Sequence, residues 1–464
     1  MRQFELILMA VALFAVLWPA VFGVRPRRGV VAVPLIAAAG VQLFAEGFRW
    51  QLVPLYGVAI GLAIGDVIFI KRDLAWSNRI VRGLFGLAGV VASVVPAVIL
   101  PVPEMPHPSG PESIGSITFE LVDPEREELY GESPGSPRRI VVQAYYPATV
   151  QSGDQPIPWS ADWEVLAPAM ARLLGMPSWF LNHTKYTDSN TYQGAVPVDS
   201  TFPVVIYSHG WTGSRNIAVN QIETLVSNGY LVLSIDHTYA AVVTVLEDGQ
   251  VVEYDRLALP DVEEVGDEAY GEASEILVET LAGDITQVID ALEAGEEGPM
   301  AGIAESADLT RLGIYGHSTG GGAAVKVCLE DERCDAVLGF DAWVEPLPDG
   351  VLKNTPTRPA LFMRSDGWRG TPNDSILRGL ADRNEAVTYW VGVDGADHND
   401  FTSAPLMSPL AGTFGFKGPI PPGRIIPIID NYLLGFFDVF LLGTGSAALE
   451  VVGFEEVSVE LLAP

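Results

Sequence analysis

The chain has 464 residues, a length that allows roughly two or three domains and a large hydrophobic core. Its 58 Asp and Glu against 27 Lys and Arg give a net charge of −31. This balance argues against a nucleic-acid partner, because phosphate binding requires clustered basic side chains. A mean hydropathy of +0.27 is too apolar for a disordered chain. Two cysteines, Cys328 and Cys334, leave open either one small disulfide or two free thiols.

Four apolar stretches open the chain, and each approaches the roughly 20 residues that a membrane-spanning helix needs. They cover residues 6–24, 29–45, 52–70 and 83–100. Basic residues gather in the first and third of the intervening loops, namely Arg25, Arg27, Arg28, Lys71, Arg72, Arg79 and Arg82. Such an asymmetry is typical of loops that stay in the cytoplasm. The sequence therefore predicts four transmembrane helices in a multi-pass protein of the cell membrane, with the rest of the chain outside the cytoplasm.

A proline-rich segment follows the apolar stretches and includes Pro101, Pro103, Pro106, Pro108 and Pro111. This density of proline is typical of a stiff, extended spacer rather than a helix. The predicted organisation is a transmembrane region at 1–103, a linker at 104–115, a globular domain at 116–445 and a C-terminal tail at 446–464.

The predicted globular domain alternates apolar strands with amphipathic helices. Strands are predicted at 139–146, 202–208, 229–236, 312–315, 336–340, 360–364 and 387–393, and helices at 218–227, 274–293 and 425–442. This alternation indicates an α/β fold whose mostly parallel sheet carries helices on both faces. Residues 241–275 are acidic with little periodicity, so we expect them to leave the sheet.

The segment Gly316-His317-Ser318-Thr319-Gly320 matches G-x-S-x-G, between a predicted strand and a glycine-rich helix start. A strand, a tight turn and a helix in this order expose the serine hydroxyl at the edge of the sheet. The N-terminus of the helix adds partial positive charge beside a developing oxyanion. Ser318 is therefore the predicted nucleophile.

A serine nucleophile needs a base, and the six histidines of the chain offer few choices. His398 follows the last predicted strand, in the segment GADHNDF, where a loop can bring the imidazole to the serine. The acid that orients this imidazole stays open between Asp341 and Asp366. Both follow late strands, and both satisfy the chain order Ser, Asp, His.

An oxyanion is stabilised by two backbone N–H donors. One is expected from Thr319, directly after the nucleophile, and the other from Trp211, in the loop after His209-Gly210. The sequence contains no metal-binding pattern and no phosphate-binding loop, so we expect neither a metal nor a cofactor.

Taken together, these motifs resemble the plasma-type (isoform II) platelet-activating factor acetylhydrolase family of α/β-hydrolases. The resemblance rests on SPRRIVVQAYYPA, SHGWTGSR, GHSTGGG, FDAWVEPL, HNDFT and NYLLGFFD, in this order over about residues 112–440. It implies an α/β-hydrolase fold and a metal-free enzyme that cleaves short or oxidised acyl chains from phospholipids. It also implies roles for individual residues: Ser318 as nucleophile, Asp341 as acid, His398 as base, and Trp211 and Thr319 as oxyanion donors.

The sequence is thus interpreted as a membrane-anchored serine ester hydrolase that acts on a small-molecule or lipid ester. Two alternatives stay open. A cutinase-like, polyester-cleaving or dienelactone-hydrolase-like esterase would use the same three residues. A membrane sensor or scaffold would keep the hydrolase domain for ligand binding alone, and a complete Ser-His-Asp set argues against that role.

Overall fold

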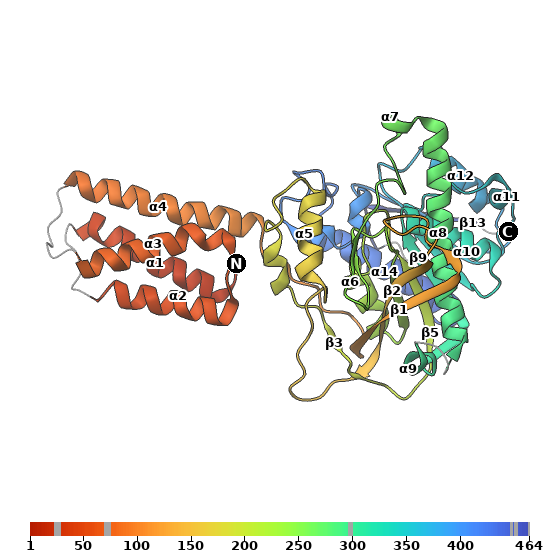
Figure 1. Cartoon of the computed structure of the whole chain (residues 1–464), viewed down its shortest axis with the longest axis horizontal. Helices are drawn as coiled ribbons and strands as arrows, with labels where there is room; N and C mark the ends of the chain where they lie inside the picture. The colour runs from red at the N-terminus through yellow and green to blue at the C-terminus, as the bar shows by residue number, and fades with distance from the viewer. Residues whose placement is uncertain (23–28, 69–75, 296–299, 446–448, 450–452, 463–464) are drawn as a thin grey trace. The chain divides into compact units, whose positions relative to one another are not determined.

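The computed structural model describes residues 1–22, 29–68, 76–295, 300–445, 449 and 453–462 (Figure 1). The chain divides into two compact units. The first comprises residues 1–103 with the short segments 182–187 and 407–410, and the second comprises the remaining residues.

The first unit is built on helices whose apolar faces pack around Leu8, Leu35, Leu55 and Val90. At one end of this core, Glu5 and Arg49 form a fully buried ion pair with an N–O distance of 2.9 Å. Burial alone would raise the pKa of the Glu5 carboxyl, but hydrogen bonds and positive charge from Arg49 and Arg2 hold this pKa below its usual value. The helices are α1 (Gln3–Phe22), α2 (Ala32–Glu46), η1 (Trp50–Leu52), α3 (Val53–Ile68), α4 (Trp76–Ile99) and the separate η2 (Asn182–Tyr186).

The prediction of four transmembrane helices is wrong. Among the described residues, no helix combines the length and the apolar character that crossing a membrane requires. The helices α2 and α3 have 15 and 16 residues, fewer than the roughly 20 that span the hydrocarbon core. The helix α1 carries the buried charge of Glu5. The predicted multi-pass placement in the cell membrane is therefore wrong as well. Five of the basic residues on which the predicted membrane orientation was based lie outside the described residues, namely Arg25, Arg27, Arg28, Lys71 and Arg72.

The second unit is built around a sheet of eleven described strands, in the order β13-β12-β11-β10-β9-β5-β6-β2-β1-β3 with β4 paired to β2. The six adjacent strands β12-β11-β10-β9-β5-β6 all run parallel to their neighbours. The strands β2 and β13 flank these six strands and pair with them antiparallel. The strands are β1 (Ser113–Glu127), β2 (Pro137–Thr149), β3 (Thr191–Gln193), β4 (Val196–Pro197), β5 (Phe202–Ser208), β6 (Leu231–Asp236), β9 (Ala307–His317), β10 (Ala336–Phe340), β11 (Ala360–Arg364), β12 (Thr388–Val393) and β13 (Val457–Leu462). The mixed α/β part of the prediction agrees with this sheet.

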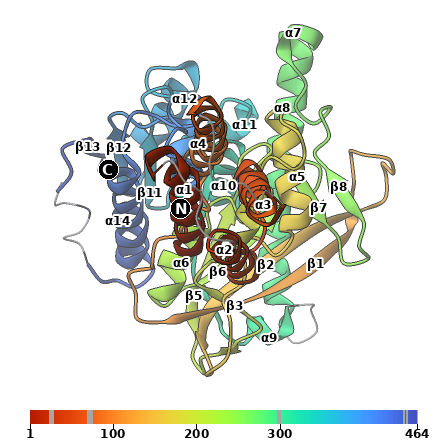
Figure 2. The same ribbon diagram turned by 90° about the vertical axis from the view of Figure 1, so that its left-hand side faces the viewer.

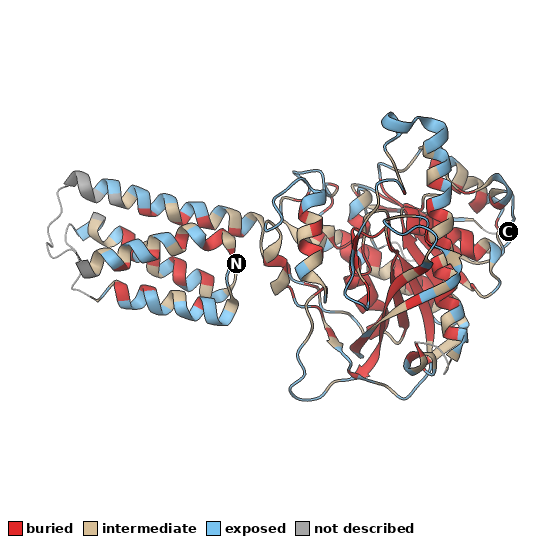
Figure 3. Cartoon of the chain, viewed as in Figure 1, coloured by how far each residue is buried: buried red, intermediate tan, exposed pale blue. Residues whose placement is uncertain are grey.

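Helices cover both faces of the sheet (Figure 2). Ile314 of β9 packs in one core with Ile285 of α8. A Cβ built on the neighbouring Gly313 would instead lie 2.4 Å from the ring of Phe437 in α14. Successive residues of a strand point to opposite faces, so α8 and α14 lie on opposite sides. The buried residues accordingly concentrate in the strands (Figure 3).

The helices of this unit and a small hairpin complete the fold. The helices are α5 (Trp163–Leu173), α6 (Val219–Ser227), α7 (Val262–Val265), α8 (Asp267–Glu293), α9 (Ala301–Ala304), α10 (Thr319–Glu330), α11 (Asp349–Leu352), α12 (Pro372–Asp382), η4 (His398–Phe401), α13 (Ala404–Met407) and α14 (Pro422–Phe440), and the hairpin pairs β7 (Val243–Val245) with β8 (Val251–Glu253).

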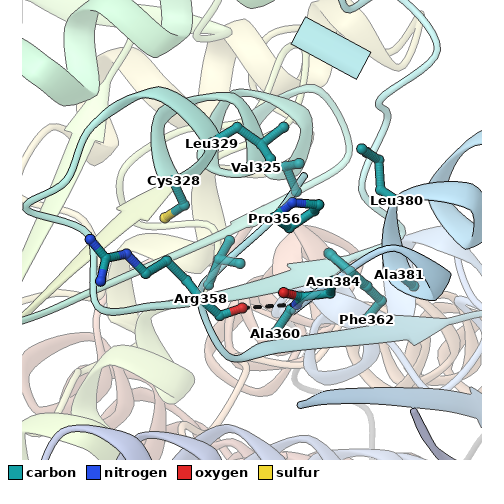
Figure 4. A pocket seen from close by; sticks show the side chains of 11 residues that line it. Val325, Cys328, Leu329, Pro356, Arg358, Ala360, Phe362, Leu380, Ala381 and Asn384 are labelled. Carbon is teal, nitrogen blue, oxygen red and sulfur yellow. Dashed lines mark hydrogen bonds between the residues drawn. The ribbon is translucent and has the colours of Figure 1, made fainter. Parts of the chain in front are cut away.

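Cys328 and Cys334 form a disulfide between α10 and the segment before β10. Cys328 also lines a cavity of about 20 Å³, together with Val325, Phe362 and Leu380 (Figure 4). A cavity of this size holds about one water molecule, so it is too small for a substrate.

Candidate active site

Ser318 occupies a strained turn between β9 and α10. Its φ of 56° and ψ of −122° are a conformation that a non-glycine residue adopts only when its surroundings enforce it. The Ser318 N–H donates to Phe340 O at 3.0 Å, and the Trp343 N–H donates to Ser318 O at 2.9 Å. A Cβ on Gly320 would lie 2.3 Å from the carbonyl oxygen of Ser208, so only glycine lets α10 start against the end of β5. The G-x-S-x-G sequence thus places Ser318 at the carboxyl end of the parallel strands.

His398 begins η4, after β12, and its ring faces Asp341 at the end of β10. The distance from His398 Nδ1 to Asp341 Oδ2 is 3.0 Å. Asp341 is buried, and Ser365 holds its carboxylate with a backbone N–H at 2.8 Å and a hydroxyl at 2.6 Å. The imidazole is therefore fixed by a carboxylate that is itself held in place.

The other two acids near His398 are used differently. Asp366 accepts a hydrogen bond from the Gly395 N–H at 2.7 Å and pairs with Arg369. Asp397 accepts from the backbone N–H of His398 at 2.7 Å and caps η4, so it does not orient the ring. Within the described chain, Asp341 is the acid that contacts the imidazole.

Burial disfavours the charged form of both members of this pair. Burial lowers the pKa of the His398 imidazole. Burial also raises the pKa of the Asp341 carboxyl, although the two hydrogen bonds from Ser365 act to lower it. A neutral imidazole whose Nδ1 faces a carboxyl presents Nε2 as the nitrogen that can accept a proton. His398 is therefore suited to act as a base at neutral pH.

Three residues that support His398 or its partner Asp341 are not among the residues predicted from the sequence. The ring of Trp368 stacks on the imidazole, with centroids 4.7 Å apart and planes 9° apart. His317 Nε2 lies 2.9 Å from the carbonyl oxygen of His398, and Ser365 holds Asp341. His317 closes β9, while Ser365 and Trp368 lie just past β11. Polar and aromatic residues directly after strands are the pattern that could have found them.

The two residues predicted as oxyanion donors lie beside Ser318. Thr319 is the first residue of α10, and the first amides of a helix have no partner within it. Trp211 follows Gly210, where a Cβ would come within 2.9 Å of Ser318 Cβ. The loop after β5 therefore passes directly against the serine, and Trp211 and Thr319 line the same cleft as Ser318 and His398.

This cleft has a volume of about 1100 Å³. One wall comes from the segment around α7 and the start of α8, which lies within the residues 241–275 that were expected to leave the sheet. Another wall comes from residues 343–349 after β10. Aromatic rings line the cleft, namely Trp211, Tyr270, Trp343 and Trp368. Four carboxylates line it as well, namely Asp267, Glu275, Glu345 and Asp349. Among the described residues that line the cleft there is no Lys or Arg. In the described residues, no group of three or more His, Cys, Asp or Glu side chains is arranged to hold a metal ion.

Comparison with known proteins gives a consistent relationship. Residues 109–441 match the family model for platelet-activating factor acetylhydrolase, isoform II. The platelet-activating factor acetylhydrolase of Canis lupus familiaris is 22% identical over 80% of this chain and 82% of its own length. The probable 1-alkyl-2-acetylglycerophosphocholine esterase of Arthroderma benhamiae is 23% identical over 78% of this chain and 94% of its own length. A ferulic acid esterase from Streptomyces cinnamoneus shares the fold, with a TM-score of 0.63 and 24% identity over 77% of this chain and 99% of its own.

The contact between His398 and Asp341 predicts how two aspartates differ in importance. Asp341→Asn should slow the labelling of Ser318 by a fluorophosphonate probe at least roughly a hundredfold, because an amide cannot hold the imidazole in the same tautomer. Asp366→Asn should leave the labelling rate within about twofold, because that carboxylate only ties a surface loop. Slow labelling in Asp366→Asn with normal labelling in Asp341→Asn would assign the acid to the other residue.

The burial of His398 predicts the pH dependence of the same reaction. The base must be neutral, so labelling should slow as the pH falls through its pKa. Because burial lowers this pKa, the half-maximal rate should lie below pH 6.5, the ordinary value for histidine. Labelling rates between about pH 4.5 and 8, with circular dichroism as a control for folding, measure the midpoint. A midpoint at or above the ordinary value contradicts the prediction.

Proposed function

The chain belongs to the platelet-activating factor acetylhydrolase, isoform II family and is a serine ester hydrolase, and we propose that it removes short acyl groups through Ser318, His398 and Asp341. The observation that supports the proposal is that Ser318, His398, Trp211 and Thr319 all line one cleft. A nucleophile, a base and oxyanion donors in one cleft are the components of acyl transfer.

The proposed reaction has two halves. The Ser318 hydroxyl attacks the ester carbonyl carbon while His398 Nε2 takes its proton, and Asp341 stabilises the resulting imidazolium. The backbone N–H groups of Trp211 and Thr319 donate to the oxyanion. His398 then returns the proton to the leaving alcohol, which departs and leaves the acyl group on Ser318. Water activated by His398 releases the acid and restores the serine.

The size of the cleft supports a bulky alcohol portion in the substrate. Small-ligand pockets usually measure about 300–1,000 Å³, and the volume here, about 1100 Å³, is far more than a short acyl group fills. The surplus space suits a lipid ester whose alcohol part extends along the cleft. We therefore propose a glycerophospholipid with a short acyl chain as the substrate class.

The charges along the cleft support a further restriction. Glu345 and Asp267 bring negative charge to the rim, and aromatic rings such as Trp343 and Tyr270 attract cations. An anionic group placed there would be repelled, whereas a quaternary ammonium group would be attracted. The cleft therefore favours esters whose alcohol part ends in a cationic or neutral group.

Removing the proposed nucleophile tests the function itself. Ser318→Ala should lower kcat/KM for p-nitrophenyl acetate at least roughly a thousandfold, because no other group in the mechanism attacks the carbonyl. Ser375→Ala, which removes an exposed serine hydroxyl from α12, is the matched control and should retain full activity. Substantial activity in the Ser318 variant would refute the proposed mechanism.

A pair of acetate esters that differ only in charge tests the restriction. Acetylcholine should be cleaved severalfold more efficiently than its uncharged carbon isostere dimethylbutyl acetate, and the ratio should shrink at high salt because exposed charges are screened. Glu345→Gln should narrow the ratio, whereas Glu385→Gln, outside the cleft, should not. A preference for the uncharged ester at low salt would contradict the proposal.

A further inference from the structure

A second serine, histidine and aspartate form a continuous hydrogen-bonded chain in the interior of the same domain. Ser208 Oγ lies 2.8 Å from His237 Nε2, and His237 Nδ1 lies 3.0 Å from Asp284 Oδ2. All three residues are 0% exposed, and none is among the described residues that line the cleft. A substrate cannot reach them, so this chain is not a second hydrolytic site.

The direction of these hydrogen bonds is fixed by an arginine. Arg138 Nη2 donates to Asp284 at 2.6 Å, and Arg138 Nη1 is paired with Glu128 at the same distance. Burial alone would raise the pKa of Asp284, but Arg138 and His237 hold it well below its usual range, so Asp284 is a carboxylate. Burial lowers the pKa of His237 and favours the neutral ring. Its Nδ1–H therefore donates to Asp284, and its Nε2 accepts the Ser208 hydroxyl.

His237 also reaches the loop that carries Trp211. The backbone N–H of His237 donates to His209 Nε2 at 3.3 Å. The Nδ1–H of His209 then donates to the carbonyl oxygen of Gly210 at 2.7 Å, one residue before Trp211. Both the hydroxyl of Ser208 and the ring of His209 are thus attached to His237, at the point where β5 leads into this loop.

The same two residues contact the turn of the nucleophile. The missing side chain of Gly320 leaves room for the carbonyl oxygens of Ser208 and His209, which would lie 2.3 and 2.4 Å from a Cβ there. Ser208 and His209 thus connect the turn of Ser318 with the loop of Trp211, so we expect a shift of either residue to move the Trp211 amide relative to Ser318. Such a shift matters, because misplacing a group by about 1 Å can cost about a hundredfold in rate.

We propose that Ser208 and His237 are positioning residues, which hold the Trp211 amide at its distance from Ser318 before substrate binds. The chain from Arg138 through Asp284 and His237 to Ser208 ties the loop after β5 to the interior of the domain. This role rests on the proposed function, since without catalysis at Ser318 there is no oxyanion to stabilise. It gives the buried arginine and histidine a part in the rate, although neither touches the substrate.

Two variants of the full chain test this role. Ser208→Ala removes the hydroxyl at the end of the hydrogen-bonded chain, and His237→Gln removes the ring. Each should lower kcat for p-nitrophenyl acetate roughly ten- to a hundredfold while KM changes less than about threefold, because the lost contact acts on the transition state. The affinity for a trifluoromethyl ketone, whose adduct with serine mimics the tetrahedral oxyanion, should fall in parallel.

Ser116→Ala is the matched control, because Ser116 is also a buried serine of the sheet whose hydroxyl is hydrogen-bonded, here to Gln143 at 3.2 Å. It should retain kcat and ketone affinity even if its melting temperature falls. Unchanged kcat and ketone affinity in Ser208→Ala would overturn the positioning role, and this variant decides the matter alone if His237→Gln does not fold. Activity in Ser318→Ala would instead show that the proposed function fails.

Discussion

The backbone of Ser318 is the constraint on which the rest of the site depends. Its positive φ costs on the order of 1–3 kcal/mol, and it persists only because the neighbouring strands enforce it. Hydrogen bonds to Phe340 and from Trp343 tie the turn to the end of β10. Close packing of Gly320 ties it to the end of β5. Because β10 leads into Asp341 and β5 leads into the loop of Trp211, this one turn holds both segments close to Ser318.

The domain contains two Asp–His pairs of similar geometry whose surroundings suit them to the different roles that we propose. Asp341 and His398 lie at the cleft, where the side chain of His398 is 27% exposed and Asp341 is held by the neutral Ser365. Asp284 and His237 have no exposure, and Arg138 compensates the aspartate. A pair that must gain and lose a proton needs access to substrate and water, whereas a pair that fixes a loop is more effective when its charge is permanently compensated. The two pairs therefore differ in their access to solvent and in the presence of an arginine beside the aspartate, and not in residue type.

Much of the fold could be predicted because its signals are local. The strands β10 and β11 are buried throughout, and so is β5 apart from Phe202, so each shows a nearly continuous apolar run in the sequence. The strand β13 is short and largely solvent-exposed at the edge of the sheet, so its sequence lacks the long apolar run that marks the buried strands. The apolar N-terminal stretches do form helices, but the stretches at 29–45 and 52–70 are longer than the described helices α2 and α3. The fully buried partner of Glu5, Arg49, is 44 residues away in the sequence. Pairings over such distances do not show in a local pattern.

The candidate site divides in the same way. Ser318 can be predicted as the nucleophile because its motif is contiguous, and His398 as the base because few histidines follow a late strand; both roles stay predictions. Asp341 and Asp366 both follow strands, and spacing alone cannot separate them; the difference lies in which carboxylate faces the ring across the sheet edge. The sequence alone could not decide between a disulfide and two free thiols either, because a spacing of six residues between Cys328 and Cys334 permits a disulfide without requiring one.

Trapping the covalent intermediate tests the central claim most directly. A carbamate ester, whose carbamoyl group leaves the enzyme slowly, should inactivate the protein in proportion to the incorporation of one carbamoyl group. Peptide mapping by mass spectrometry should place that group on Ser318. A carbamoyl group on any other side chain, or inactivation with Ser318 unmodified, would contradict the account.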